Sequence, residues 1–202
     1  MPTQTFQNLP QEKKDKVLAA AINEFSVRNV EEAKFSNIAK DAAIPRGSIY
    51  QYFDSKDDLY VYVFQTLREW RREFKEPAFK YYKTSPFLEF FEHYYELDSE
   101  YLLRHQQHID LGKVMYGHAR GVSLGLILEI KMQYKDIFVI GIDYDKDHGR
   151  IRKDVNATVL ADLCIHFMTD IFIFQNITDR MSMNSVKKHL AGTMEIIRQG
   201  VE

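Results

Sequence analysis

The chain of 202 residues has a single cysteine, Cys164, so it cannot form an intramolecular disulfide. This fits a reducing compartment, and we expect a cytoplasmic protein. The first residues contain no basic stretch followed by an apolar one. No apolar run approaches the ~20 residues that a membrane span needs. The sequence therefore predicts neither a secretory signal nor a membrane helix.

Charge of one sign is also lacking, because 27 basic and 29 acidic side chains give a formal net charge of −2. This balance argues against a protein that is basic over its whole surface, although a local DNA-reading face needs only a few cations. Glycine and proline are scarce, and strand-like alternation of apolar and polar residues is rare. These features predict an all-α fold without tandem repeats.

Motifs for catalysis are missing as well. The sequence has no glycine-rich phosphate loop, no G-x-S-x-G elbow and no H-E-x-x-H pair. Cys164 lies in an apolar run, where a cysteine is more often inert packing than a nucleophile. We therefore expect no enzyme and no cofactor.

Two segments weakly resemble metal sites. His105 and His108 share a helical face from which Asp110 turns away, and two histidines are too few for a closed zinc site. The acidic segment Asp143–Asp154 resembles a calcium loop, but it has His148 at the glycine position and aspartate at the terminal glutamate position. We predict no metal site, and we interpret Asp143–Asp154 as a solvated loop.

Apolar residues at helical spacing cover nearly the whole chain. The first predicted helix is Pro10–Arg28, in which Val17, Ala21 and Phe25 form one apolar face. Asn29 follows it, and asparagine tolerates the left-handed conformation that ends a helix. The further predicted helices are Phe35–Ala42, Pro45–Tyr52, a long helix from about Ser55 to Lys75 limited by Pro77, Pro86–Tyr101, Leu102–Tyr116, Arg120–Ile142, Val155–Gln175 and Asn184–Gln199.

The segment Phe35–Phe53 matches a helix-turn-helix, the unit that places its second helix in the major groove of DNA. Ala39 is small, so the two helices can approach closely, and the turn falls at Ala43 and Ile44. The start of the second helix, near Arg46, would direct free N–H groups towards phosphate. The residues expected to form a small core with the first helix are Ile38, Ile44, Ile49 and Phe53.

About a dozen positions between Lys16 and Leu59 fit one further pattern in register: Leu18-Ala19-Ala20-Ala21, Phe25, Ile38-Ala39, Arg46-Gly47-Ser48-Ile49-Tyr50, Tyr52-Phe53, Lys56 and Leu59. This stretch resembles the tetracycline-repressor (TetR) family of bacterial regulators. The resemblance implies a three-helix helix-turn-helix DNA-binding domain at residues 1–55. It also implies a helical ligand-binding and dimerisation domain at residues 56–202.

The sequence departs from the family pattern at several positions. Asn29 stands where glycine is usual, and Ala43 replaces the turn glycine, which strains the backbone if φ is positive there. Ala33-Lys34 replaces a threonine pair and loses a hydroxyl cap, at a cost of ~1 kcal/mol. Pro45-Arg46 replaces a common serine-lysine pair. The expected fold survives these changes, but the operator sequence does not carry over.

The resemblance also indicates which residues touch DNA. Arg46 and Ser48 are expected to read base edges, and Lys56 to hold a phosphate. Lys34 could supply a second phosphate contact. The hydroxyls of Tyr50 and Tyr52 are expected on phosphates, with the alternative that half of the Tyr50 ring completes the small core. For any one of these residues alone, the alternative is plain solvated surface.

The C-terminal part is dense in aromatic residues. Such helical stripes usually form core, and the alternative is a pocket for a hydrophobic or aromatic small molecule. The predicted pocket residues are Trp70, Phe74, Phe91, Tyr95 and Phe167. The last helix has an apolar stripe that, with the apolar run Leu163–Phe174, predicts a four-helix interface between two copies. The predicted interface residues are Val186, Leu190, Met194 and Ile197.

The function predicted from these features is a ligand-responsive homodimeric repressor that binds a pseudo-palindromic operator in double-stranded DNA. The resemblance implies that ligand binding tilts the fourth helix and changes the distance between the recognition helices. One alternative is a helical small-molecule-binding protein or enzyme with a vestigial helix-turn-helix. Another is an adaptor that acts through protein contacts alone.

Overall fold

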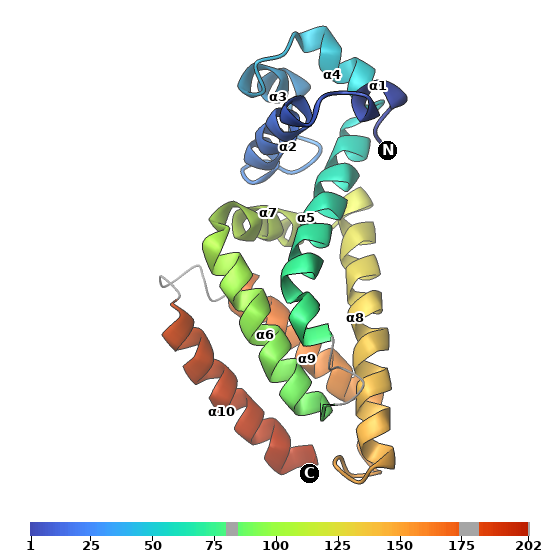
Figure 1. Ribbon diagram of the computed structural model, residues 1–202, viewed down its shortest axis with the longest axis vertical. Coiled ribbons are helices and arrows are strands. Elements are labelled where there is room, and N and C mark those ends of the chain that lie inside the picture. Colours follow the sequence, from blue (N-terminus) through green and yellow to red (C-terminus); the bar gives the residue numbers. More distant parts are fainter. Residues whose placement is uncertain (80–84, 174–181, 202) are drawn as a thin grey trace. The chain divides into compact units, whose positions relative to one another are not determined.

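The computed structural model describes residues 1–79, 85–173 and 182–201, and every regular element within them is an α-helix (Figure 1). The predicted all-α fold is therefore confirmed. The helices are α1 (Gln4–Gln7), α2 (Gln11–Phe25), α3 (Phe35–Asp41), α4 (Arg46–Tyr52), α5 (Lys56–Phe79), α6 (Phe87–Arg104), α7 (Gln106–Gly117), α8 (Gly121–Asp147), α9 (Ala157–Ile173) and α10 (Met183–Val201). None of the described helices has the length and apolar composition of a membrane span.

The helices pack into two compact units. Unit 1 contains Met1–Trp70 and Gln106–Ile127, and unit 2 contains Arg71–His105 and Leu128–Glu202. The long helices α5 and α8 contribute one part to each unit. The two packing units do not correspond to the two domains predicted from the sequence, so they do not test the predicted domain boundary after residue 55. That boundary stays a prediction.

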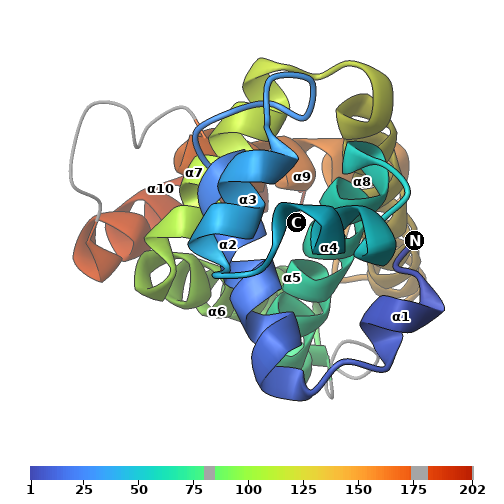
Figure 2. The same cartoon turned by 90° about the horizontal axis from the view of Figure 1, so that it is seen from above.

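The core of unit 1 follows the apolar pattern of the sequence. Val17, Ala21 and Phe25 are fully buried on one face of α2, as predicted. Ile38, Ile49 and Phe53 are fully buried against them, and Ile44 is partly buried. The short helix α1, which the sequence did not predict, lies beside α4 and adds the ring of Phe6 to this core (Figure 2).

The core of unit 2 is built from aromatic rings. The ring of Phe138 on α8 lies between 5.5 and 6.4 Å from four rings of α6. These four rings are Phe87, Phe90, Phe91 and Tyr94. Gly141 makes this approach possible, because a Cβ there would lie 3.0 Å from Cδ2 of Phe87. Cys164 is buried in the same unit, and burial raises the pKa of its thiol to about 12.

Several helix ends differ from the prediction. α2 ends at Phe25, and Asn29 is not left-handed, since Ala43 is the only non-glycine residue with positive φ in the described ranges. α5 continues through Pro77 to Phe79. α6 begins at Phe87, close to the predicted start, and runs to Arg104. The predicted end of the helix Val155–Gln175 lies outside the described residues.

The predicted loop Asp143–Asp154 is wrong in its first part, because α8 extends to Asp147. The reason is a tertiary contact of Asp145, which is almost fully buried. Its carboxylate accepts hydrogen bonds from the backbone N–H of Phe87 (2.6 Å) and from Nη1 of Arg150 (2.8 Å). These bonds hold the last turn of α8 against the start of α6. The acidic side chain at the centre of the calcium-like segment therefore serves packing.

Candidate nucleic-acid interface

The turn between α3 and α4 is tight. Ile44 N–H donates to the carbonyl of Ala39 (3.0 Å), and Ala43 N–H donates to the carbonyl of Lys40 (3.1 Å). Ala43 has a φ of 54°, so the strain expected for a non-glycine residue at this position is present. Such a residue costs on the order of 1–2 kcal/mol. Burial of Ala39 and of the core isoleucines holds the turn despite that cost.

The seven residues of α4 divide into a buried and an exposed face. Ile49 and Tyr52 point into the core, whereas Arg46, Tyr50 and Gln51 are exposed. Ser48 is half-buried. This division places the polar groups of the predicted recognition helix on its outer side.

Gly47 lies on the same outer side. A Cβ added to Gly47 would meet no described atom within 4 Å, so packing within the chain does not require glycine there. Glycine inside a helix costs about 1 kcal/mol relative to alanine. Its presence fits a surface on which another molecule approaches the backbone closely.

The two tyrosines of α4 differ in burial. The sequence analysis considered a core position for Tyr50, but the buried one is Tyr52. Tyr50 is 56% exposed, and its ring meets that of Phe35 edge-on at 5.2 Å. Tyr52 is 8% exposed and packs 5.8 Å from the ring of Phe6. Tyr52 is therefore the tyrosine that completes the small core. Its predicted DNA contact is confined to a small exposed part, and Tyr50 offers the larger polar surface.

Lys34 is exposed at the N-cap of α3, which has no side-chain cap, as the missing hydroxyl predicted. The carboxylate of Glu24 on α2 organises this junction instead. It accepts hydrogen bonds from Lys34 N–H (2.9 Å), from Nδ2 of Asn37 (3.0 Å) and from Nη1 of Arg28 (2.9 Å). Sequence reasoning missed Glu24, although it stands seven residues after Val17 on the apolar face, where a charged side chain needs partners.

Lys56, the first residue of α5, holds the loop before α3. Its Nζ donates to the carbonyls of Glu31 (2.5 Å) and Ala33 (3.0 Å). An ammonium group has three donors, so these two bonds leave one for a further acceptor. The phosphate contact of Lys56 stays a prediction, and the structure adds a second role, which is to fix the start of α5 to the loop that carries Lys34.

Helix α7 and the start of α8 complete unit 1. Nε2 of Gln107 donates to Oδ1 of Asn23 on α2 (2.8 Å), and Arg120 forms an ion pair with Glu31 (3.4 Å). The hydroxyl of Tyr60 on α5 accepts a hydrogen bond from Ser123 on α8 (3.2 Å). Burial raises the pKa of Tyr60 to about 12, so the phenol is neutral at physiological pH. The helix-turn-helix is thus supported within unit 1 by α7 and by the start of α8.

Comparison with known proteins identifies this arrangement. Residues 17–63 match the family model described as "Bacterial regulatory proteins, tetR family". The whole fold is similar to that of a TetR family transcriptional regulator from Chloroflexus aurantiacus J-10-fl, with a TM-score of 0.76, 18% identity and coverage of 100% of this chain and 98% of that one. The likeness to the tetR family is thus one of sequence over the helix-turn-helix segment and one of fold over the whole chain.

Two other relatives define the extent of the likeness. A segment of 50 residues is 44% identical to the uncharacterized HTH-type transcriptional regulator YdgC of Bacillus subtilis (strain 168), covering 25% of this chain and about a quarter (26%) of that relative. The regulator FadR of Bacillus subtilis, solved in complex with stearoyl-CoA, has a TM-score of 0.71, 18% identity and coverage of 88% of this chain and 97% of that one.

The residues predicted to line a pocket are only partly brought together. Phe167 on α9 lies 6.5 Å from Phe91 and 5.0 Å from Tyr95, ring centre to ring centre. Phe74 pairs with the ring of Tyr101 instead (5.5 Å). Trp70 belongs to unit 1, where it stacks on His108. Three of the five predicted residues therefore form one cluster.

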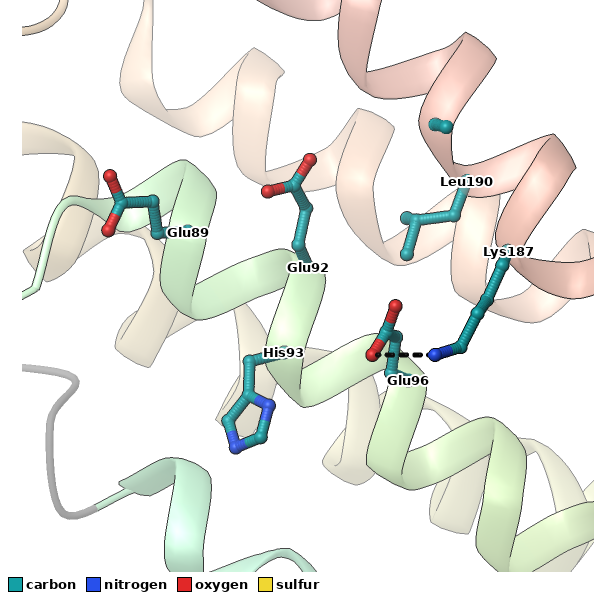
Figure 3. Close-up of a pocket in the computed structure, with 7 residues that line it drawn as sticks. Glu89, Glu92, His93, Glu96, Lys187 and Leu190 are labelled. Atoms are coloured by element: carbon teal, nitrogen blue, oxygen red, sulfur yellow. Dashed lines mark ion pairs between the residues drawn. The ribbon is translucent and has the colours of Figure 1, made fainter. Parts of the chain in front are cut away.

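A hollow of about 380 Å³ lies between α6 and α10 (Figure 3). Its lining is mostly charged, unlike the aromatic pocket predicted from the sequence. The residues that line it are Glu89, Glu92, His93, Glu96, Lys187, Leu190 and Ala191. Lys187 forms an ion pair with Glu96 across it (3.7 Å). This chemistry does not suit an apolar molecule.

The predicted dimer residues of α10 point mostly inward. Val186, Leu190 and Met194 are buried, because α10 packs along α6 of the same chain, and Ile197 is half-buried. The exposed apolar side chains of the last two helices are different ones. Among the described side chains of these two helices, they are Val159 and Leu163 on α9 and Ile196 on α10.

Proposed function

We propose that this chain is a TetR-family transcriptional repressor that binds a pseudo-palindromic operator through α4. The observation that carries the proposal is the outer face of α4, where Arg46, Gly47 and Tyr50 are exposed while Ile49 and Phe53 anchor the helix in the core. A helix of this kind reads base edges in the major groove. The chain would act in the cytoplasm, by binding rather than by catalysis.

We also propose that a small molecule releases the operator. FadR of Bacillus subtilis, which has a similar fold, was solved with stearoyl-CoA, so this fold can hold a small molecule. In this chain, α5 starts four residues after α4 and continues as one helix into unit 2. A ligand that binds unit 2 and favours a DNA-incompetent state would act through this helix.

The DNA-binding proposal is tested by fluorescence anisotropy with the DNA that flanks the protein's own gene. A scrambled duplex of equal length serves as the control, and both are measured over a series of salt concentrations. We expect tight binding to the gene-flanking DNA that weakens steeply with salt, because Lys and Arg contacts release counterions from phosphates. Equal and weak binding to both duplexes, and to a genomic fragment library, would exclude the proposal.

For the dimer, we propose that a second copy covers the exposed apolar residues of α9 and α10. Val159 and Leu163 are one helical turn apart and share a face, and both are more than half exposed in the single chain. The ring of Phe167 stacks on His189 at 5.5 Å and joins α9 to α10, so Ile196 can belong to the same surface. Two such surfaces would form a four-helix interface.

Leu163→Glu should convert the dimer to a monomer at micromolar concentration, as measured by sedimentation velocity. The introduced charge would be buried against the second copy without a partner, whereas it is solvated in the monomer, so helix content should not change. Met132→Glu is the matched control, because Met132 is a 65% exposed apolar residue of the same unit on α8. A Leu163→Glu protein that remains dimeric would disprove this interface.

A further inference from the structure

Unit 2 contains a cluster of three charged side chains, two of which are buried while the third, Arg71, is 33% exposed. Asp98 on α6 is bound by Arg71 of α5 through Nε (3.3 Å) and Nη2 (2.7 Å). The same carboxylate pairs with Nζ of Lys75 at 2.8 Å. Lys75 is 1% exposed and Asp98 2% exposed, so both charges are removed from water. We refer to Arg71, Lys75 and Asp98 as the buried charge cluster.

Two tyrosines complete the surroundings of Lys75. Its Nζ donates to the hydroxyl of Tyr94 on α6 (2.5 Å) and to the hydroxyl of Tyr134 on α8 (3.1 Å). With Asp98, these acceptors use all three donors of the ammonium group. Nζ also lies 4.4 Å from the centre of the Tyr94 ring and 5.3 Å from that of Tyr134. Three helices, α5, α6 and α8, therefore meet at this lysine.

The buried charge cluster is not neutral. Within the part of the chain that the structure describes, it has two cations and one carboxylate. Asp98 neutralises only one of the two cations, so a net positive charge remains. The rings and hydroxyls offset it only in part, and Arg71 brings part of it to the surface. Burial raises the pKa of the Tyr134 hydroxyl, but the charges of Lys75 and Arg71 outweigh it and hold that pKa below its usual value. The surroundings therefore favour an anion.

We propose that the buried charge cluster binds the head group of an anionic amphiphile, a carboxylate or phosphate attached to a hydrocarbon or aromatic body. The Arg71 side chain is 33% exposed and Tyr134 is half-buried, so the cluster reaches the surface at these two residues. Asp98 uses two of the five guanidinium N–H donors. The rings of Tyr94 and Phe138, 6.2 Å apart and both buried, form the apolar surroundings of the charges inside the unit.

The position of the cluster also explains how such a ligand would change the affinity for operator DNA. This part of the inference rests on the proposed function. Arg71 and Lys75 belong to α5, whose first residue, Lys56, is bound to the loop before α3. An anion that draws Arg71 and Lys75 away from Asp98 changes the forces on this one continuous helix. A ligand with higher affinity for that state would lower the affinity for DNA by linkage.

The test compares charged with uncharged amphiphiles of equal length. Octanoate, dodecanoate and dodecyl phosphate, with octanol and dodecanol as neutral partners, are titrated into the full chain by isothermal calorimetry. We expect at least one anion to bind about tenfold or more tightly than its alcohol, the effect of one charge-assisted hydrogen bond. The carboxylate and phosphate arms distinguish the two head groups.

Lys75→Met identifies the site. This variant leaves Arg71 and Asp98 as a neutral pair, so its melting temperature without ligand should stay equal or rise while the preference for the anion disappears. Lys153→Met, at an exposed lysine in the loop before α9, is the matched control and should bind like the wild type. Arg71→Gln, which leaves the Lys75–Asp98 pair, serves as a second variant because its side chain is partly exposed.

Equal binding of anions and alcohols, or no binding of either, would overturn the inference. So would a tyrosinate absorbance at neutral pH that Tyr134→Phe abolishes, since the cluster would then contain its own counter-charge. The DNA assay without ligand is independent of these results. Loss of DNA binding with an intact anion preference would refute the regulator but not the site.

Discussion

Replacing Asp98 by asparagine should lower the free energy of unfolding by about 3–5 kcal/mol, the typical cost of breaking a buried ion pair. Asparagine keeps the shape of the side chain but removes its charge, so Arg71 and Lys75 remain as two unpaired cations. The loss is measured by urea unfolding of the full chain, followed by circular dichroism and by the fluorescence of Trp70. A shift of less than about 1 kcal/mol, the range of exposed pairs, would show that the cluster is solvated.

Asp162 provides the matched control for this experiment. Its carboxylate on α9 also faces two cations, Lys135 at 2.8 Å and Lys131 at 3.6 Å, but it is 30% exposed. Asp162→Asn should therefore change the free energy of unfolding by no more than about 1 kcal/mol. The comparison separates the effect of burial from that of having two lysine or arginine partners.

The acid limb of the stability curve gives an independent view of Asp98. Burial alone raises its pKa, but the charges of Arg71 and Lys75 outweigh burial and lower it to about 2. A depressed pKa means that the stabilisation is fully present above the unfolded value near 4 and is lost as the pH falls towards 2. The wild type should therefore lose about 2 kcal/mol more than Asp98→Asn across this window.

Arg46→Ala should weaken binding to the specific operator by roughly 10–100-fold, which corresponds to about 1–3 kcal/mol for one bidentate base contact. Arg46 is exposed at the start of α4, so the melting temperature should not change. Arg152→Ala, at an exposed arginine of unit 2 that pairs with Asp154 at the surface, is the matched control. Both variants are measured by anisotropy against operator and scrambled DNA.

The pattern of the loss tells which DNA group Arg46 touches. A base contact weakens operator binding and leaves the weak binding to scrambled DNA nearly unchanged. A phosphate contact weakens both equally and reduces the salt slope by about one. Unchanged operator affinity would exclude Arg46 from the interface.

The helix-turn-helix could be predicted from the sequence because its core follows local spacing. Ile38, Ile49 and Phe53 have the positions that a helix pair needs, and all three are buried. The two tyrosines show where resemblance to a family was less reliable than spacing. Tyr52 stands three residues after Ile49, on the same helical face, so periodicity alone places it inward.

The interface of the last helix could not be predicted in the same way. Val186, Leu190 and Met194 have the correct spacing for a buried stripe, and they are buried. Periodicity indicates that a face is covered, but not whether α6 of the same chain or a second copy covers it. The same limit applies to the buried charge cluster, because its members are separated by up to 27 residues in sequence and meet only through tertiary packing.

The buried thiol of Cys164 makes this chain a convenient object for spectroscopy. Since its pKa is raised to about 12 and its side chain is inaccessible, maleimide dyes should leave the native protein unlabelled. A cysteine introduced at exposed Gln51 on α4 would then be the sole reactive thiol in each protomer. In the proposed dimer, paired probes at that position would report the separation of the two recognition helices directly, as a candidate effector is added and the DNA is released.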